Sequence, residues 1–160
     1  MNQIRIGQGY DVHAFSECGP LILGNVEIPS DQGLLGHSDA DVLLHAIIDS
    51  LLGALAMGDI GGHFPDTDPK YAKVDSAKLF KPIWEKIQQE GWQLVNCDSV
   101  VIAEKPKLAP HINSIRKRLS ELFGCDLSQV SVKATTSERL GFVGREEGIA
   151  AMATCLLEKR

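Results

Sequence analysis

The sequence lacks features that would each point to another class of protein. None of its four cysteines stands in a C-x-x-C pair, which argues against a zinc ribbon or a redox motif. Its net charge is -5 without a long run of like charge, which argues against a basic surface for nucleic acid. The first residues lack the apolar core of a signal peptide. The most apolar stretch, 42–57, contains His45 and Asp49 and is too short for a membrane span. We expect a cytoplasmic protein with reduced cysteines that binds neither nucleic acid nor membrane.

The residues that are present suit one compact domain over 1–160. Hydrophobic residues make up 44% of the chain, which is enough for a core and too many for a disordered chain. If an acidic protein of this kind binds a phosphate compound, it must supply positive charge locally. Bound metal ions are a ready source of that charge.

The spacing of apolar residues predicts an α/β (α+β) sandwich, in which helices cover one face of a mixed four-stranded sheet beside a small hairpin. A short strand is expected over 4–10, running into a turn at Gly7 and Gly9. The first helix should begin near Ser38, because Ser38 and Asp41 form an S-x-x-D capping pattern. The other expected elements are a hairpin over 20–29, a mobile loop over 32–37, helices over 38–57, 75–90 (which Pro82 should kink or start later) and 110–123, and strands over 94–104, 130–136 and 149–158.

Asp11 and His13 are the sharpest local feature. Side chains two residues apart in an extended segment leave the same face, so both could meet one divalent ion such as zinc. His45 lies in an otherwise apolar helix, with Asp41 and Asp49 four residues to either side. His45 is either a buried histidine satisfied by a carboxylate or a third metal ligand whose second ring nitrogen is oriented by a neighbouring Asp. Three ligands would leave one position of a catalytic zinc site open for substrate.

Two polar loops could bind the rest of a substrate. In the loop 59–68, backbone N–H groups near Gly61 and the side chain of Asp66 could hold a polyol or a phosphate, but the loop could equally be a turn held by Asx hydrogen bonds. The segment 133–147 places hydroxyls directly after a strand, and Glu138 could hold a hard cation such as magnesium. An ordinary polar exit from a strand would look the same.

Five stretches, taken together and in order, resemble the 2-C-methyl-D-erythritol 2,4-cyclodiphosphate synthase family of non-mevalonate isoprenoid synthesis. One such stretch would be weak support, whereas five in the family's order between residues 6 and 150 are strong support. The stretches are IGQGYDVHAF, GLLGHSDADVLLHAIIDSLLGA, GDIGGHFPDTDP, PKLAPHI and VKATTSERLGFVGREEGIA.

The resemblance implies the metals and the assembly. It implies that Asp11, His13 and His45 bind Zn2+, and that Glu138 holds a second divalent cation, Mg2+ or Mn2+, against the substrate's diphosphate. The family is a homotrimer with its active sites between neighbouring subunits. Tyr10 stands where the family often has phenylalanine, so a central cavity of the trimer would be more polar here.

The resemblance also implies which residues contact the substrate. His37 and Thr136 match positions that stabilise the transition state, and Lys107, otherwise readable as a surface lysine, matches one near the diphosphate. The central cavity, which can hold an isoprenoid diphosphate in relatives, would be faced by Phe142, Arg145 and Glu147. The full implied set of substrate contacts is Asp11, His13, His37, Ser38, Asp59, Ile60, Gly61, Phe64, Pro65, Asp66, Thr67, Asp68, Ala103, Lys107, Leu108, Ala109, Ala134, Thr135, Thr136, Ser137, Glu138, Phe142 and Arg145, of which Asp59, Gly61 and Asp66 match the methylerythritol end and residues 103–109 the cytidine pocket.

The implied substrate is 4-diphosphocytidyl-2-C-methyl-D-erythritol 2-phosphate, which closes to the 2,4-cyclodiphosphate and releases CMP. Its phosphate nucleophile is already an anion, which explains why no Ser-His-Asp triad or catalytic cysteine is visible. Leu108 and Ala109 replace the family's more usual Met-Leu pair, which leaves the contacts to the cytosine open. The alternatives are a metal-dependent phosphohydrolase and a non-catalytic trimer that binds isoprenoid diphosphates through Arg145.

Overall fold

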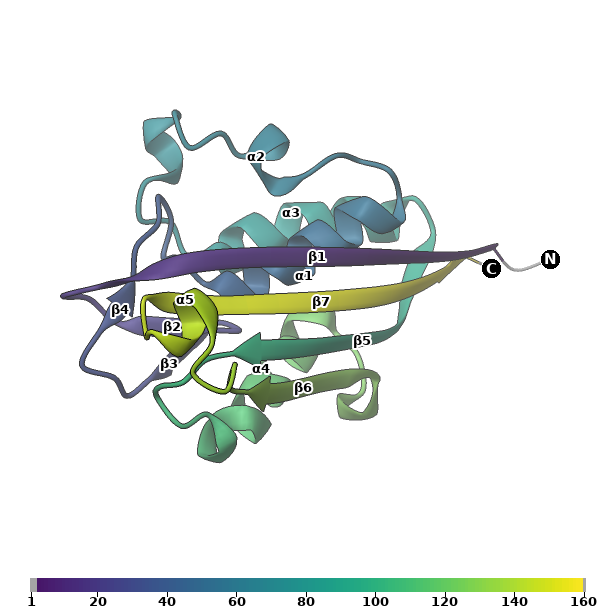
Figure 1. The fold of residues 1–160 in the computed structure, drawn as a ribbon. Helices are drawn as coiled ribbons and strands as arrows, with labels where there is room; N and C mark the ends of the chain where they lie inside the picture. Colours follow the sequence, from purple (N-terminus) through teal and green to yellow (C-terminus); the bar gives the residue numbers. More distant parts are fainter. Residues whose placement is uncertain (1–2, 160) are drawn as a thin grey trace.

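The computed structural model describes residues 3–159 of the chain (Figure 1). Its main sheet has five strands in the order β4-β1-β7-β5-β6, and a second sheet pairs β2 with β3. β5 and β6 run parallel and the other neighbours run antiparallel, so the main sheet is mixed, as predicted. The strands are β1 (Gln3–Ser16), β2 (Leu21–Leu23), β3 (Val26–Ile28), β4 (Gly33–Leu34), β5 (Trp92–Ile102), β6 (Val130–Thr135) and β7 (Gly148–Lys159); the helices are α1 (Val42–Ala54), α2 (Ile60–His63), α3 (Ser76–Gln89), α4 (Ile112–Phe123) and α5 (Gly141–Gly144), with 3₁₀ turns at Pro69–Tyr71, Ala109–His111 and Leu127–Gln129.

The predicted sheet was one strand short. The additional strand, β4, consists of only two residues, and these pair with Phe15 and Ser16 at the end of β1. It lies in the segment 32–37, which was expected to be a mobile loop. Two residues leave no alternation of apolar and polar side chains, so the sequence carries no signal for this edge strand. The predicted small hairpin is confirmed as the β2–β3 sheet.

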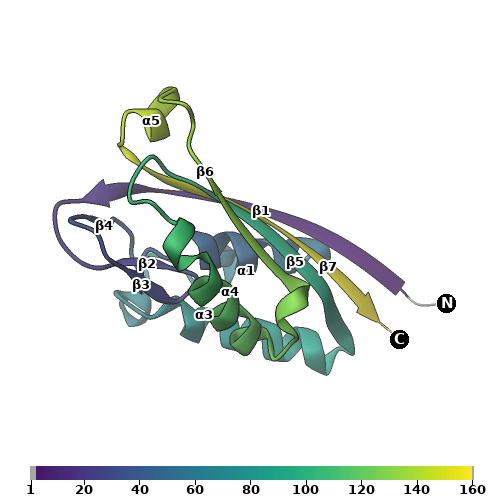
Figure 2. The same ribbon diagram turned by 90° about the horizontal axis from the view of Figure 1, so that it is seen from below.

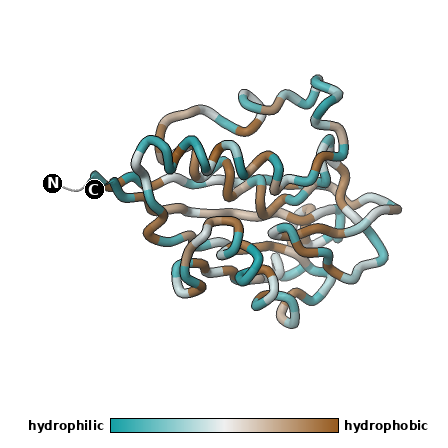
Figure 3. Tube along the Cα trace, turned by 180° about the vertical axis from the view of Figure 1, so that it is seen from behind, coloured by the Kyte–Doolittle hydropathy of each residue, from teal (hydrophilic) through white to brown (hydrophobic). Residues whose placement is uncertain are grey.

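The helices α1, α3 and α4 lie on one face of the main sheet (Figure 2). α1 packs against β1 and β7 and buries nearly all of its side chains, including Leu43, Ile47 and Leu51. Hydrophobic residues accordingly recur along the strands and helices of the interior, whereas the outer turns are mostly hydrophilic (Figure 3). A single hydrophobic cluster joins side chains of the sheet, the hairpin and these three helices.

Gly7 and Gly9 do not form the predicted turn. β1 continues through both of them to Ser16, and both are buried beneath α1. A Cβ atom on Gly7 would lie 1.9 Å from the backbone oxygen of Ser50, and one on Gly9 would lie 1.9 Å from that of Ala46. The glycines are therefore present because the backbones of strand and helix approach closely, which is the other common reason for glycine in a strand.

The predicted helices are present, with corrected starts. α1 begins at Val42 rather than near Ser38, because Asp41 is the N-cap and accepts a hydrogen bond from the backbone N–H of Leu44. α3 begins at Ser76, so Pro82 lies inside the helix and does not delay its start. α4 begins after a 3₁₀ turn, and Gly124 ends it in the left-handed conformation with φ of 66°.

The face of the sheet opposite the helices exposes large apolar side chains. Ile4, Ile6 and Tyr10 of β1 are 61%, 68% and 53% exposed, and Val12 and Met152 lie beside them. At one end of this sheet Gln3 pairs with Lys159, so the first and last described residues are neighbours. The functional residues described next lie toward the other end of β1.

Candidate functional site

β1 and α1 bring together the three residues predicted to bind metal. Asp11 and His13 project from the same face of β1, toward α1, because they are two residues apart in an extended strand. His45 projects from the first turn of α1. The close approach at Gly7 and Gly9 sets the spacing between the two elements and thereby allows the three side chains to meet.

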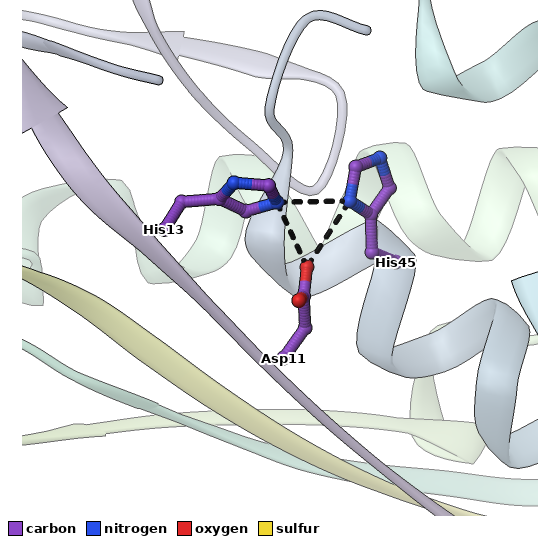
Figure 4. Close-up of side chains that lie close together, drawn as sticks. All are labelled: Asp11, His13 and His45. Carbon is purple, nitrogen blue, oxygen red and sulfur yellow. Dashed lines mark hydrogen bonds and ion pairs between the residues drawn. The ribbon is translucent and has the colours of Figure 1, made fainter. Parts of the chain in front are cut away.

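The three side chains converge through one atom each (Figure 4). Asp11 Oδ2 lies 3.0 Å from His13 Nε2 and 3.1 Å from His45 Nδ1. The two ring nitrogens are 3.2 Å apart. Within residues 3–159 this is the one group of three or more His, Cys, Asp or Glu side chains that is close enough to share a metal ion.

The donor set fits a divalent metal ion. Zinc bonds to nitrogen and oxygen of about 2.0–2.1 Å in tetrahedral geometry separate the donor atoms by about 3.3 Å. The observed separations of 3.0–3.2 Å need to open by only a few tenths of an ångström. Asp11 and His13 are half-buried and His45 is buried, so an ion here would contact both the protein and the adjoining cleft.

Both imidazole rings are held from their far side. His13 Nδ1 donates to the backbone oxygen of Leu35 over 2.6 Å. His45 Nε2 lies 2.9 Å from Ser76 Oγ and 3.0 Å from Ser38 Oγ.

The expectation that Asp41 or Asp49 orients His45 was wrong, because each carboxylate is occupied elsewhere. Asp41 accepts from the N–H groups of Gly24, Asn25 and Leu44, which joins α1 to the hairpin. Asp49 accepts from the N–H of Ile60 over 2.8 Å and so anchors the first residue of α2.

In the metal-free protein the electrostatics of the site favour a charged pair, formed by ionised Asp11 and protonated His13. Burial opposes ionisation of Asp11, but hydrogen bonds and charge interactions with His13 and His45 outweigh it and hold the pKa of Asp11 well below its ordinary value. Burial likewise opposes protonation of His13, and the hydrogen bond with Asp11 outweighs it and raises the pKa of His13 above 6.5. A proton held by His13 is one that a metal ion must displace.

A cleft of about 420 Å³ opens beside the cluster. Tyr71 and Leu79 also line it and were missed from the sequence, because neither stands in a chemically distinctive pattern. His37 Nε2 lies 3.1 Å from the backbone oxygen of Asp68, and Asp59 caps α2 by accepting from Gly62 N. Of the predicted substrate contacts, the cleft is lined by Asp11, His13, His37, Ser38, Ile60, Gly61, Phe64, Pro65 and Asp66, whereas Asp59, Thr67 and Asp68 stand in the same loop without lining it.

A second hollow, of about 190 Å³, lies where the parallel strands β5 and β6 end. Glu104, which lies within the stretch 103–109 matched to the cytidine pocket, also lines it; its Oε1 accepts from the backbone N–H groups of Ser137 and Arg139 and so holds the loop after β6. The hollow shares no lining residue with the first cleft. The predicted contacts that line it are Ala103, Lys107, Leu108, Ala109, Ala134, Thr135 and Thr136.

Glu138 and the predicted cavity residues do not line the cleft beside the cluster. Glu138 Oε1 accepts from Thr136 Oγ1 over 3.1 Å, and Glu138 is not part of the three-residue group. Phe142 is 37% exposed on the short helix α5. Arg145 donates to Glu147 over 2.8 Å, and both side chains are exposed.

Comparisons with known proteins show which family this chain resembles in sequence and in structure. The model of the YgbB family matches residues 4–158. A 2-C-methyl-D-erythritol 2,4-cyclodiphosphate synthase from Bacillus cytotoxicus is 59% identical over 156 residues, which are 98% of this chain and 99% of the relative. Among solved structures, IspF of Plasmodium falciparum in a CDP complex has a TM-score of 0.87 and 37% identity, covering 100% of this chain and 99% of that one. Bifunctional IspDF from Campylobacter jejuni has a TM-score of 0.96 and 40% identity, and this chain spans 43% of its length.

The fold and the cluster thus define a mixed α/β protein with a candidate metal centre in a cleft. The chain belongs to the YgbB family, whose similar curated relatives are named as cyclodiphosphate synthases. The resemblance drawn from the five sequence stretches is confirmed. Within residues 3–159, no helix has the length and apolar character that a membrane crossing requires.

Proposed function

We propose that this protein converts 4-diphosphocytidyl-2-C-methyl-D-erythritol 2-phosphate to 2-C-methyl-D-erythritol 2,4-cyclodiphosphate with release of CMP. The observation that carries the proposal is the convergence of Asp11, His13 and His45 beside a cleft. The chain's relatives bear the name of this synthase, which agrees with the predicted class, a phosphorus–oxygen lyase of the non-mevalonate pathway.

The chemistry needs alignment and charge rather than a strong base. An oxygen of the 2-phosphate bonds to the β-phosphorus. The bond from that phosphorus to the oxygen shared with the α-phosphorus breaks, and CMP leaves with that oxygen. Divalent ions, when bound, supply positive charge that reduces the repulsion between the phosphates. In this proposal Asp11, His13 and His45 hold Zn2+, and Glu138 holds Mg2+ or Mn2+.

The two hollows divide the substrate between them. The cleft beside the cluster takes the methylerythritol end, where His37 and Asp66 contribute polar groups. The hollow at the ends of β5 and β6 takes the cytidine, with Lys107 near the diphosphate and Thr136 near the reacting phosphate. Holding both ends fixes the folded-back geometry in which attack becomes effectively intramolecular.

The assignment of the two ends of the substrate to two separate hollows supports a homotrimer with its active sites between subunits. The two hollows share no residue, and Glu138 does not line the cleft beside the cluster within one chain. A neighbouring subunit can bring the second hollow and its Glu138 to the first cleft. The exposed apolar residues on β1, among them Ile6 and Tyr10, supply a surface for such packing. Phe142, Arg145 and Glu147 would then face a central cavity that could take an isoprenoid diphosphate.

The proposal treats residues 1–160 as one domain and keeps the predicted cytoplasmic location. The free thiols of Cys18, Cys97, Cys125 and Cys155 favour a reducing compartment.

Product analysis tests the reaction. The protein is incubated with the substrate and Zn2+ plus Mg2+, and phosphorus NMR follows the products. We expect CMP and a cyclic diphosphate in equal amounts, and no activity after chelation or in Asp11→Ala. Glu85→Gln, which removes an exposed carboxylate of α3, is the matched control and should keep full activity. A linear product would establish the phosphohydrolase instead, and isoprenoid diphosphate binding without CMP release would establish the non-catalytic trimer.

Subunit mixing tests the shared site. Asp11→Ala and Glu138→Ala should each be inactive alone. If one subunit supplies Asp11 and its neighbour supplies Glu138, refolding the two variants together forms some interfaces with both native residues, and activity returns. A mixture that assembles as a trimer and stays inactive would refute the shared site.

A further inference from the structure

The imidazole of His45 is held by a hydroxyl from a distant part of the chain. Ser76 is the first residue of α3, is fully buried, and places its Oγ 2.9 Å from His45 Nε2. This contact lies on the opposite side of the ring from Nδ1, the atom that faces Asp11 and His13. No pattern in the sequence marked Ser76 as part of the site.

The direction of each hydrogen bond in this contact can be worked out from the carboxylate of Asp39. Asp39 Oδ1 accepts from the hydroxyl of Ser76 in a short contact and from the backbone N–H of Asp41. Asp39 Oδ2 accepts from the backbone N–H of Ser76 over 2.9 Å. A carboxylate surrounded by donors acts only as an acceptor, so Ser76 gives its single hydroxyl proton to Asp39. Toward His45, Ser76 Oγ can then only accept, so this contact is a hydrogen bond only when His45 Nε2 carries the proton.

We propose that Asp39 and Ser76 are positioning residues that hold His45 as its Nε2–H tautomer and so present the lone pair of Nδ1 to the metal ion. This inference rests on the proposed metal site. Ser38 Oγ, 3.0 Å from the same Nε2, can act as a second acceptor. His13 has the opposite arrangement, because its Nδ1 donates to the carbonyl of Leu35 and its Nε2 faces the cluster.

The arrangement matters because Asp11 acts in the opposite sense. Its carboxylate oxygen, 3.1 Å from His45 Nδ1, attracts a proton to the very atom that must be free to bind metal. An acceptor at Nε2 offsets that attraction. Asp39 N also donates to the backbone oxygen of Val74, which ties the loop before α1 to the segment before α3 behind the ring.

Zinc affinity measured by competition with a chelator tests the proposal. We expect Ser76→Ala to raise the dissociation constant by about 10–100-fold, the usual effect of removing a group that orients a metal-binding histidine. Ser76→Thr keeps the hydroxyl and should recover most of that loss. The matched control is Ser50→Ala, which removes an equally buried hydroxyl that bonds to Ile47 and Cys155 instead. An affinity of Ser76→Ala within twofold of the wild type overturns the proposal.

Nitrogen NMR of the imidazole rings gives a readout that a merely structural role would not move. In the zinc-loaded wild type we expect a protonated Nε2 on His45 and a protonated Nδ1 on His13. Ligation of His45 through Nε2 would overturn the proposal even if every Ser76 variant failed to fold. The proposed function and the positioning role fail on different results. If the wild type shows no zinc binding that is lost in Asp11→Ala, the proposed function fails. If zinc binding depends on Asp11 but its affinity does not change in the Ser76 variants, only the positioning role fails.

Discussion

Replacing Gly9 with alanine should separate the two elements that form the candidate metal site. The added Cβ would lie 1.9 Å from the backbone oxygen of Ala46 and 2.9 Å from the backbone nitrogen of Ser50. Both neighbours are backbone atoms of α1, so no side chain can turn away to make room. The helix must therefore move away from β1, or the strand must distort.

The size of the movement follows from the contact distance. Relieving the contact from 1.9 Å to an ordinary 3.4 Å requires a shift of 3.4 - 1.9 = 1.5 Å. Metal–ligand distances tolerate only about 0.2 Å. His45 lies on the same helix turn as Ala46, so a shift of this size takes it out of reach of an ion held by Asp11 and His13. The strain should cost at least about 3 kcal/mol of unfolding free energy, the upper end of the usual cost of overpacking.

Urea unfolding of the metal-free protein and zinc titration measure the two effects. Gly53→Ala is the matched control, because its Cβ would meet only Gln8 O at 3.7 Å. Since Gly53 lies inside α1, alanine there should stabilise the protein by up to about 1 kcal/mol and leave zinc binding unchanged. If Gly9→Ala is as stable as the wild type and binds zinc equally, the account of how β1 and α1 form the site is wrong.

Other perturbations test the site and the core separately. Zinc affinity should keep increasing as pH rises above 6.5, because the bond with Asp11 raises the pKa of His13 and the proton must leave before zinc binds; an affinity independent of pH there would contradict this. In the metal-free protein the stability contributed by His13 is full below pH 6.5 and is lost as pH rises through its raised pKa, which thermal unfolding would detect. Lys107→Ala should raise KM for the substrate several-fold while leaving zinc affinity unchanged. If zinc affinity weakens by the same factor, Lys107 does not act on the substrate alone. Leu51→Ala, at a fully buried position of α1, should cost about 2–5 kcal/mol in urea unfolding, and a smaller loss would indicate that the core collapses around the cavity.

Local periodicity was enough to predict much of the fold and the two segments that carry the candidate metal cluster. Asp11 and His13 share a face because they are two residues apart in a strand, and His45 is recognisable as a polar residue in an apolar helix. What periodicity could not supply is the distance between strand and helix. Gly7 and Gly9 were assigned to a turn, since glycine in a strand pattern fits both a turn and a close approach.

The remaining errors arise from contacts between segments that are distant in the chain. Asp41 and Asp49 were the natural partners for His45 by helical spacing, yet the folded chain uses Asp41 for the hairpin and Asp49 for α2. Ser76 stands at the start of a predicted helix, but spacing along the chain cannot show that the long connection between α1 and α3 brings this start beside His45. Assignments that depended on the matched motifs, such as Lys107 beside the second hollow, needed the family resemblance rather than spacing.

The pairing of Gln3 with Lys159 has a practical consequence for engineering. Gln3 and Lys159 lie side by side, and the eight steps along extended β1 from Gln3 to Asp11 span about 26 Å. A short linker that joins Gln3 to Lys159 would therefore lie far from the cluster of Asp11, His13 and His45. A fluorescent or affinity module attached at Gln3 or Lys159 would likewise be held about that distance from the cluster.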